Sequence, residues 1–166
     1  LLAARSGKCI RFKVSDVRVF SGRTSTGVRG IRLGGDDVVM AMSILGHVAV
    51  DTDTRDDYLR LAAAKRRENG DEPAHGALTP DQFEALAAGE EFLLTVTENG
   101  YGKRTSAYEY RVTGRGGQGI ANIDTSERNG PVVASFPVAD GDQVMMVTDG
   151  GQIIRMPVND IRIAGR

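Results

Sequence analysis

Cysteine and histidine are scarce in this 166-residue chain, and their scarcity excludes several kinds of chemistry. Cys9 is the one cysteine, and His47 and His75 are the two histidines. A single cysteine forms no internal disulfide, and no Cys/His spacing typical of a metal site is present. The sequence shows no combination of a nucleophile, a base and an acid that is typical of a catalytic site. Cys9 stands among apolar neighbours, so we interpret it as a packed strand residue in a reducing, cytoplasmic compartment.

Long apolar runs and a leader sequence are also missing. No apolar run approaches the roughly 20 residues that span a bilayer, so we expect no membrane partner. The chain has no signal peptide and begins at Leu1, inside an apolar run, rather than at a methionine. It ends at Arg166, part way through a repeated phrase. We therefore interpret it as a fragment or an excised domain.

The net charge of −1 conceals an asymmetry along the chain. Residues 47–91 contain 11 acidic and 5 basic residues, a net charge of −6. The remaining residues contain 16 basic and 11 acidic ones, a net charge of +5. Such an asymmetry indicates what the chain binds rather than how it folds, and the basic part favours binding to a polyanion.

One phrase, Gly-x-x-x-Arg followed seven residues later by a second arginine, occurs three times. The first arginines are Arg11, Arg104 and Arg155, spaced by 93 and then 51 residues. Alternating or apolar runs predict strands at Ile10–Phe20, Phe92–Thr97, Lys103–Thr113 and Val132–Val138, and at least one of Met145 and Met146 should be a core residue. A period of about 50 residues with four short strands per unit is typical of propeller blades. We predict an all-β fold of propeller-like blades, about two and a half repeat units, with a small helical insertion. The predicted parts are a blade at 1–46, an acidic helical insertion at 47–90, a blade at 91–138 and a partial blade at 139–166.

The insertion has its own helix signals. Thr54 followed by an acid at the third helical position predicts one start, and Asn69-Gly70 predicts its stop. Thr79, with Pro80 at the first helical position and Gln82 able to reach back, predicts a second start. Gly89 ends this second helix. Apolar residues of both helices fall on single faces and need an apolar partner: Tyr58, Leu61, Phe83 and Leu86.

The recurring arginines are the best candidates for binding. A guanidinium contacts phosphate bidentately, and we expect the first set to emerge on one exposed edge of successive blades. For the second set, Arg18, Arg111 and Arg162, a phosphate contact and internal pairing with a carboxylate remain equally open. Two Gly-rich loops, 22–27 and 114–119, are candidates for phosphate contact or for simple tight turns. Neither loop has the features of a P-loop or a dinucleotide fingerprint.

At the second repeat these patterns become specific. The string Thr97–Thr105, then Glu109-Tyr110-Arg111, then Arg115–Ile120, resembles the C-terminal domain of DNA gyrase A. The resemblance covers nearly all of the chain except 47–90. It implies a β-pinwheel whose basic rim wraps duplex DNA, and a cytoplasmic, nucleoid-associated protein. Of the family's Gln-Arg-Arg-Gly-Gly-x-Gly box, Arg115–Gly119 retains the Arg-Gly-Gly-x-Gly part alone, which implies weaker DNA binding than that of the whole domain.

The resemblance also implies partners and cofactors. The partners would be duplex DNA, gyrase B and a second copy of gyrase A. The chain itself would carry no cofactor and no catalytic residue, whereas ATP and Mg²⁺ would serve the holoenzyme. The alternatives are the pinwheel of topoisomerase IV and a propeller that binds other proteins. The predicted DNA-binding residues are Arg11, Arg23, Arg29, Lys103, Arg104, Arg115, Gln118, Arg155 and Arg166.

Overall fold

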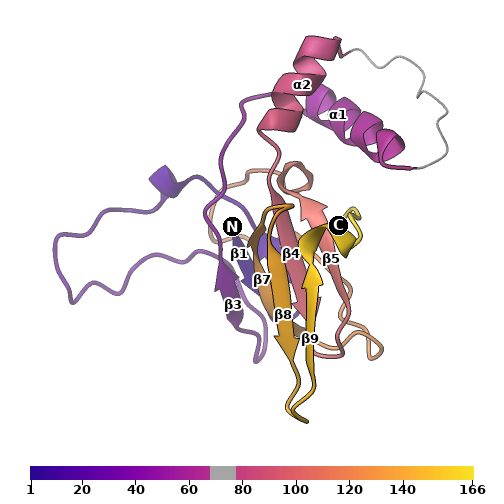
Figure 1. The fold of residues 1–166 in the computed structure, drawn as a ribbon. Coiled ribbons are helices and arrows are strands. Elements are labelled where there is room, and N and C mark those ends of the chain that lie inside the picture. The colour runs from indigo at the N-terminus through magenta and orange to yellow at the C-terminus, as the bar shows by residue number, and fades with distance from the viewer. Residues whose placement is uncertain (68–77) are drawn as a thin grey trace. The chain divides into compact units, whose positions relative to one another are not determined.

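The computed structural model describes residues 1–67 and 78–166 and divides into two compact units (Figure 1). The first, called here the β unit, comprises residues 1–45 and 92–166. The second, called the helical unit, comprises residues 46–91. The predicted stop at Asn69-Gly70, and His75, lie outside the described residues.

The first sheet of the β unit has four antiparallel strands in the order β3-β1-β2-β6. Its strands are β1 (Leu2–Ala4), β2 (Lys8–Ile10), β3 (Val39–Met42) and β6 (Ile120–Ala121). Three of them come from the first repeat, whereas β6 belongs to the second. The pairs that join them are Cys9 with Ile120 and Lys8 with Ala121. The first repeat's sheet is therefore completed by a strand of the next repeat.

The second sheet has three antiparallel strands in the order β5-β4-β7. They are β4 (Phe92–Thr97), β5 (Gly102–Ser106) and β7 (Val132–Val138). Arg104 of β5 forms a parallel bridge with Ile163 of the third repeat, just as Arg11 does with Val112 of the second. The third repeat adds the hairpin β8 (Gln143–Val147) and β9 (Ile153–Pro157). The described strands do not close into a ring.

The sequence predicted one continuous strand over Lys103–Thr113, and this prediction is wrong. β5 ends at Ser106, and a 3-10 turn, η2 (Ala107–Glu109), follows. The hydroxyl of Ser106 accepts a hydrogen bond from the backbone N–H of Tyr108, which stabilises the turn in place of the ladder. Equivalent turns follow in the other repeats, η1 (Val14–Asp16) and η3 (Val158–Asp160), so the strand expected over Ile10–Phe20 is interrupted as well.

The core of the β unit lies between the first two repeats. Cys9, Leu93, Ala107 and Tyr110 form its fully buried cluster, so the packed position predicted for Cys9 is confirmed. Next to it, the Tyr110 hydroxyl donates to the side-chain oxygen of Asn122 at 2.6 Å. The expectation that Met145 or Met146 is a core residue is not met, because Met145 is 68% exposed and Met146 is half-buried.

Burial raises the pKa of the Cys9 thiol to about 12, which predicts that this thiol reacts slowly in the folded protein. A thiol reacts with alkylating reagents as its thiolate, so we expect negligible labelling of the folded chain at pH 8 and rapid labelling in denaturant. The check is the rate of iodoacetamide modification followed by mass spectrometry across a urea titration. Equal rates with and without urea would contradict the buried position.

The helical unit consists of α1 (Thr52–Lys65) and α2 (Pro80–Ala88), as the sequence predicted (Figure 1). The capping box predicted at Thr79 and Gln82 is present, and Gly89 ends α2. The start predicted at Thr54 is wrong by three residues. The carboxylate of Asp51 accepts hydrogen bonds from both the backbone N–H and the hydroxyl of Thr54, so Asp51 is the cap.

The apolar side chains of the two helices contact each other within the helical unit. The rings of Tyr58 and Phe83 lie 5.0 Å apart, and the Lys65 ammonium sits 4.1 Å from the centre of the Phe83 ring. The Tyr58 hydroxyl donates to Glu90, which also pairs with Arg66. The helices thus supply at least part of the apolar partner that their sequence requires.

Candidate nucleic-acid interface

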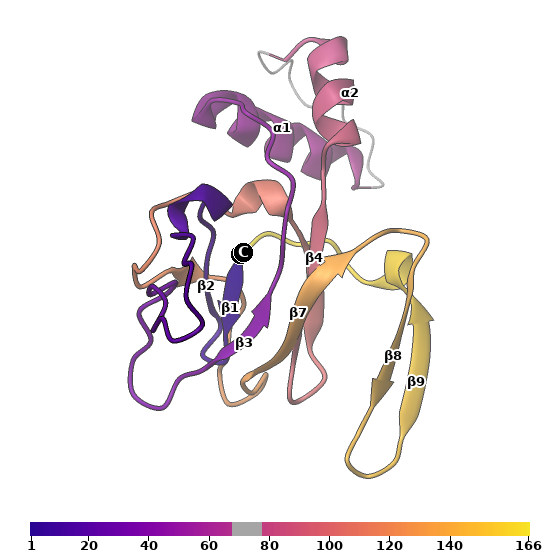
Figure 2. The same cartoon turned by 90° about the vertical axis from the view of Figure 1, so that its left-hand side faces the viewer.

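The strand order gives each sheet an inner and an outer edge. β3 and β7 lie side by side, so the first two sheets converge at these strands (Figure 2). The opposite edge of the first sheet is formed by β6 and by the preceding segment 111–119, which runs beside Arg11. We call this the outer edge. It carries the loop 114–119, which contacts the segment that holds the exposed Arg29 and Arg32.

Arg11 does not lie on an exposed edge, contrary to the sequence-based expectation. Its side chain is buried, with 8% exposure, and its guanidinium donates to the backbone oxygen of Ala107 at 2.8 Å and of Tyr110 at 3.4 Å. Both acceptors belong to the turn η2 and its end. Arg11 of the first repeat therefore clamps the 3-10 turn of the second.

Arg104 makes the equivalent contacts one repeat later. It is 5% exposed, and it donates to the backbone oxygens of Ile161 at 2.7 Å and Asn159 at 3.2 Å. A third contact joins it to the carboxylate of Asp140 at 2.5 Å. The expectation of an exposed position is wrong here too. Arg11 and Arg104 occupy equivalent places because each binds backbone oxygens at the turn of the following repeat.

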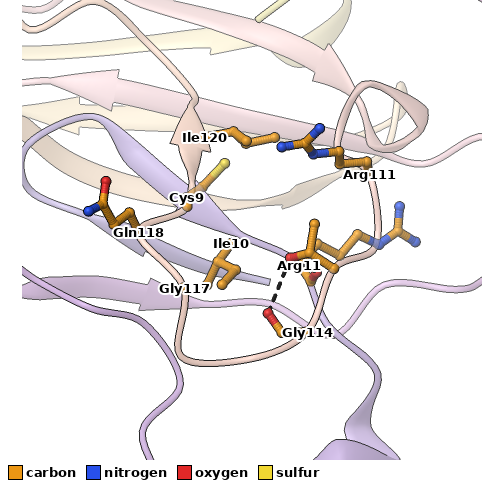
Figure 3. Close-up of a pocket in the computed structure, with 10 residues that line it drawn as sticks. Cys9, Ile10, Arg11, Arg111, Gly114, Gly117, Gln118 and Ile120 are labelled. Atoms are coloured by element: carbon orange, nitrogen blue, oxygen red, sulfur yellow. Dashed lines mark hydrogen bonds between the residues drawn. The ribbon is translucent and has the colours of Figure 1, made fainter.

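An open hollow of about 210 Å³ lies on the outer edge (Figure 3). Cys9, Ile10 and Ile120 are among its apolar lining residues, and Arg111 and Gln118 are labelled on opposite sides of it in Figure 3. Arg111 is exposed, and among the residues that the structure describes its guanidinium has no hydrogen-bond or ion-pair partner. Of the two arginines in the second repeat's phrase, Arg111 is the one available to a phosphate.

The loop 114–119 is a turn that binds the neighbouring segment 27–32. The backbone N–H of Gly116 donates to Gly30, and the oxygen of Gly117 accepts from Arg32. Arg115 donates to the backbone oxygens of Asp16 at 2.9 Å and Arg29 at 3.0 Å, although its side chain remains exposed. The loop's peptide groups are thus used inside the protein, which favours the tight-turn interpretation. Its side chains remain on the surface.

The other residues predicted to bind DNA differ in how exposed their side chains are. Arg23, Arg29, Gln118 and Arg155 are exposed. Arg166 is exposed too, with its guanidinium 4.0 Å from the Glu109 carboxylate. Lys103 is half-buried and donates to the backbone oxygen of Gly165 at 2.5 Å. Desolvation by burial lowers the pKa of Lys103 below that of an ordinary lysine, so this ammonium serves the protein's own packing more than its surface.

Sequence reasoning missed a basic group next to this set. Arg32 is exposed, and Lys8 on β2 pairs through its backbone with Ala121 at the outer edge. Arg128 stacks on the Tyr101 ring at 4.9 Å, and a hydrogen bond to that tyrosine raises the pKa of Arg128. A search for exposed cations in the turns between strands, rather than for recurring ones, could have found Arg128, which lies between β6 and β7.

Metal and membrane signals are absent from the residues described. No group of three or more His, Cys, Asp or Glu side chains that could hold a metal ion occurs among residues 1–67 and 78–166. In the same part of the chain, no helix is both long and apolar enough to cross a bilayer.

A first sheet completed by a strand of the second repeat, and a bridge from the second sheet to the third repeat, define a mostly β, pinwheel-like repeat protein. The particular family follows from comparison. The profile described as "DNA gyrase C-terminal domain, beta-propeller" matches residues 1–45, 91–139 and 142–166. This chain belongs to that family. Each matched segment contains one copy of the repeated phrase, and residues 46–90 lie outside the match.

Individual relatives agree with the family. The chain is 48% identical to DNA gyrase A of Granulibacter bethesdensis and 46% identical to that of Rickettsia bellii, in each case over 100% of this chain. The alignments cover 20% and 19% of those relatives, so the chain spans about a fifth of their length. They confirm the predicted resemblance to gyrase A.

A solved structure supports the fold. The C-terminal domain of DNA topoisomerase IV superposes with a TM-score of 0.64, covering 99% of this chain and 38% of that chain. The sequence identity is 17%, so this likeness concerns the fold alone.

Proposed function

We propose that this chain binds and wraps duplex DNA, without preference for base sequence, as part of DNA gyrase. Its family membership carries the proposal, and the exposed cations of the outer edge support it. We further propose that the three repeats are blades of a pinwheel, about two and a half in number. Gyrase B, a second copy of gyrase A, ATP and Mg²⁺ belong to the proposed holoenzyme, which would act in the cytoplasm on nucleoid DNA.

The proposed contacts are electrostatic. Cations that neutralise phosphates release counterions, which gives affinity without reading bases, and a curved outer edge sets the path of the duplex. Bending 20–30 base pairs costs on the order of 1–6 kcal/mol, so several cations must act together. We propose this role for the exposed side chains and assign Arg11 and Arg104 to the packing of the repeats. The proposed set is Arg23, Arg29, Arg111, Arg115, Gln118 and Arg166.

The test is a salt titration of binding to a mixed-sequence duplex. Each phosphate contact contributes about −0.9 to the slope of log K against log salt, so Arg23→Ala with Arg29→Ala should make the slope shallower by about 2. The matched control removes two arginines from the helical unit, Arg60→Ala with Arg67→Ala, and should leave the slope unchanged.

Two results would count against the proposal. Affinity that does not fall as salt rises from about 50 to 200 mM would remove the electrostatic basis. Equal losses in the Arg23→Ala, Arg29→Ala variant and in its control would show that net charge acts, rather than these two positions.

A further inference from the structure

One end of the β unit is built from the turns between its strands. We call residues 5–8, 97–101 and 124–131 the turn end. They contain the β1–β2 turn, the β4–β5 turn and most of the loop from β6 to β7. The last two lie at the same end of the unit (Figure 2). The loop also contacts the first turn, because the hydroxyl of Thr125 donates to the backbone oxygen of Ser6 at 3.1 Å.

Arg128 of this loop is held at both its backbone and its guanidinium. The side-chain nitrogen of Asn99 donates to the backbone oxygens of Glu127 at 3.1 Å and Arg128 at 3.0 Å. The guanidinium carbon lies 4.9 Å from the centre of the Tyr101 ring, and Nε donates to the Tyr101 hydroxyl at 3.2 Å. Asn99 and Tyr101 both belong to the β4–β5 turn. One turn therefore fixes both ends of this arginine.

The two terminal nitrogens of the Arg128 guanidinium remain available. The residue is exposed, and among the residues that the structure describes neither Nη1 nor Nη2 has a hydrogen-bond or ion-pair partner. A guanidinium can contact two oxygens of one phosphate at once. An exposed side chain usually loses rotamer freedom when it binds a ligand. Arg128 has already lost much of this freedom on folding, so its contact with an anion costs less.

The surrounding charges do not by themselves attract a polyanion. The turn end contains three basic and three acidic residues, all exposed: Arg5, Lys8, Arg128, Glu98, Asp124 and Glu127. Their charges cancel. A contact with DNA at this place therefore depends on how one guanidinium is placed, rather than on a broad basic surface.

We propose that Arg128 contacts a phosphate of duplex DNA and that Tyr101 is its positioning residue. Tyr101 acts through Arg128, by stacking on the guanidinium and accepting the Nε–H, and itself need not touch the DNA. The loop that carries Arg128 follows β6, which forms the outer edge, so one duplex can contact both places. The path of the wrapped duplex thus includes the turn end. This inference rests on the proposed function.

The experiment measures binding to a mixed-sequence duplex at salt concentrations from about 50 to 200 mM. Arg128→Ala removes one phosphate contact, so the slope of log K against log salt should become shallower by about 0.9. Arg67→Ala removes an exposed arginine of the helical unit and should leave the slope unchanged. Glu127→Gln removes a negative charge beside the proposed phosphate and should raise the affinity, whereas Glu84→Gln in the helical unit should not.

Variants of Tyr101 separate positioning from support of the fold. Tyr101→Ala leaves the charge of Arg128 in place, so the salt slope should stay the same while the affinity falls about three- to tenfold. Tyr101→Phe keeps the ring and should lose less. In a chain that already carries Arg128→Ala, the change Tyr101→Ala should cause no further loss, because Tyr101 acts through that arginine. A urea titration checks that each variant is folded.

Three results would count against these proposals, and they are distinguishable. A steep salt dependence of the unchanged chain that Arg128→Ala leaves as it is would overturn the inference and spare the proposed function. An unchanged chain whose binding does not weaken with salt would overturn both. Equal losses from Tyr101→Ala with and without Arg128 would show that Tyr101 supports the fold and does not position the arginine.

Discussion

Replacing Arg104 with alanine is expected to lower the free energy of unfolding by about 2–4 kcal/mol. The guanidinium binds two backbone oxygens of the third repeat and the carboxylate of Asp140, and it is 5% exposed. A hydrogen bond to a charged group contributes about 1.5–3 kcal/mol, and its loss leaves polar groups unpaired. The measurement is a urea titration followed by tyrosine fluorescence. Three of the four tyrosines, Tyr101, Tyr108 and Tyr110, lie in the β unit.

Arg155→Ala is the matched control for this prediction. It makes the same substitution at the equivalent position of the next repeat, where the guanidinium is exposed. It should change the free energy of unfolding by less than about 0.5 kcal/mol. Equal losses from Arg104→Ala and Arg155→Ala would contradict the clamp. A double change of Lys103 and Arg104 would therefore report on folding as well as on DNA binding.

Replacing Gly119 with alanine is expected to weaken the pairing of β6 with β2. Gly119 has φ +76°, and an added Cβ would lie 2.4 Å from the backbone oxygen of Cys9. The positive φ alone costs an L-residue about 1–2 kcal/mol, and relief of the backbone clash requires β6 to move away from β2. We expect a total loss of about 2–4 kcal/mol. Amide hydrogen exchange at Lys8 and Cys9 should show where the pairing opens.

Gly27→Ala separates the cost of the positive φ from the cost of the backbone clash. Gly27 is the equivalent residue of the first repeat and has φ +75°, but nothing lies within 4 Å of its added Cβ. Its substitution should cost the conformational penalty of about 1–2 kcal/mol and no more. Equal losses of stability in both variants would contradict the prediction, because they would show that the clash with the Cys9 backbone adds nothing to the cost of the positive φ.

The parts of the fold that depend on neighbouring residues could be predicted from the sequence. The capping box at Thr79 and Gln82, and the strands Phe92–Thr97 and Val132–Val138, follow from local spacing and are found as predicted. The helix start at Asp51 was missed because an acid three residues before Thr54 caps as well as Thr54 itself would. Local signals of this kind compete within a few residues, so errors are small.

The role of the repeated arginines could not be predicted in the same way. Recurrence shows that Arg11 and Arg104 occupy equivalent environments. Arginines that bind phosphate on an exposed edge, however, would recur at the same spacing as arginines that bind peptide oxygens of the next repeat. The deciding acceptors lie far along the chain, since Ile161 is 57 residues from Arg104. The supply of β6 by the second repeat is equally non-local. The turn η2 also interrupts the strand alternation that would otherwise indicate on which face of the sheet the second arginine, Arg111, lies.

The origin of β6 in the second repeat has a consequence for synthesis on the ribosome. The first sheet receives its fourth strand only when Ile120 has been made, 110 residues after Ile10. At the usual rate of elongation this takes about 5–20 s. Throughout that interval the hydrogen-bonding groups of β2 stay open to other nascent chains, which is the condition under which sheet edges aggregate. The speed of translation through residues 47–119 therefore bears on the yield of folded protein.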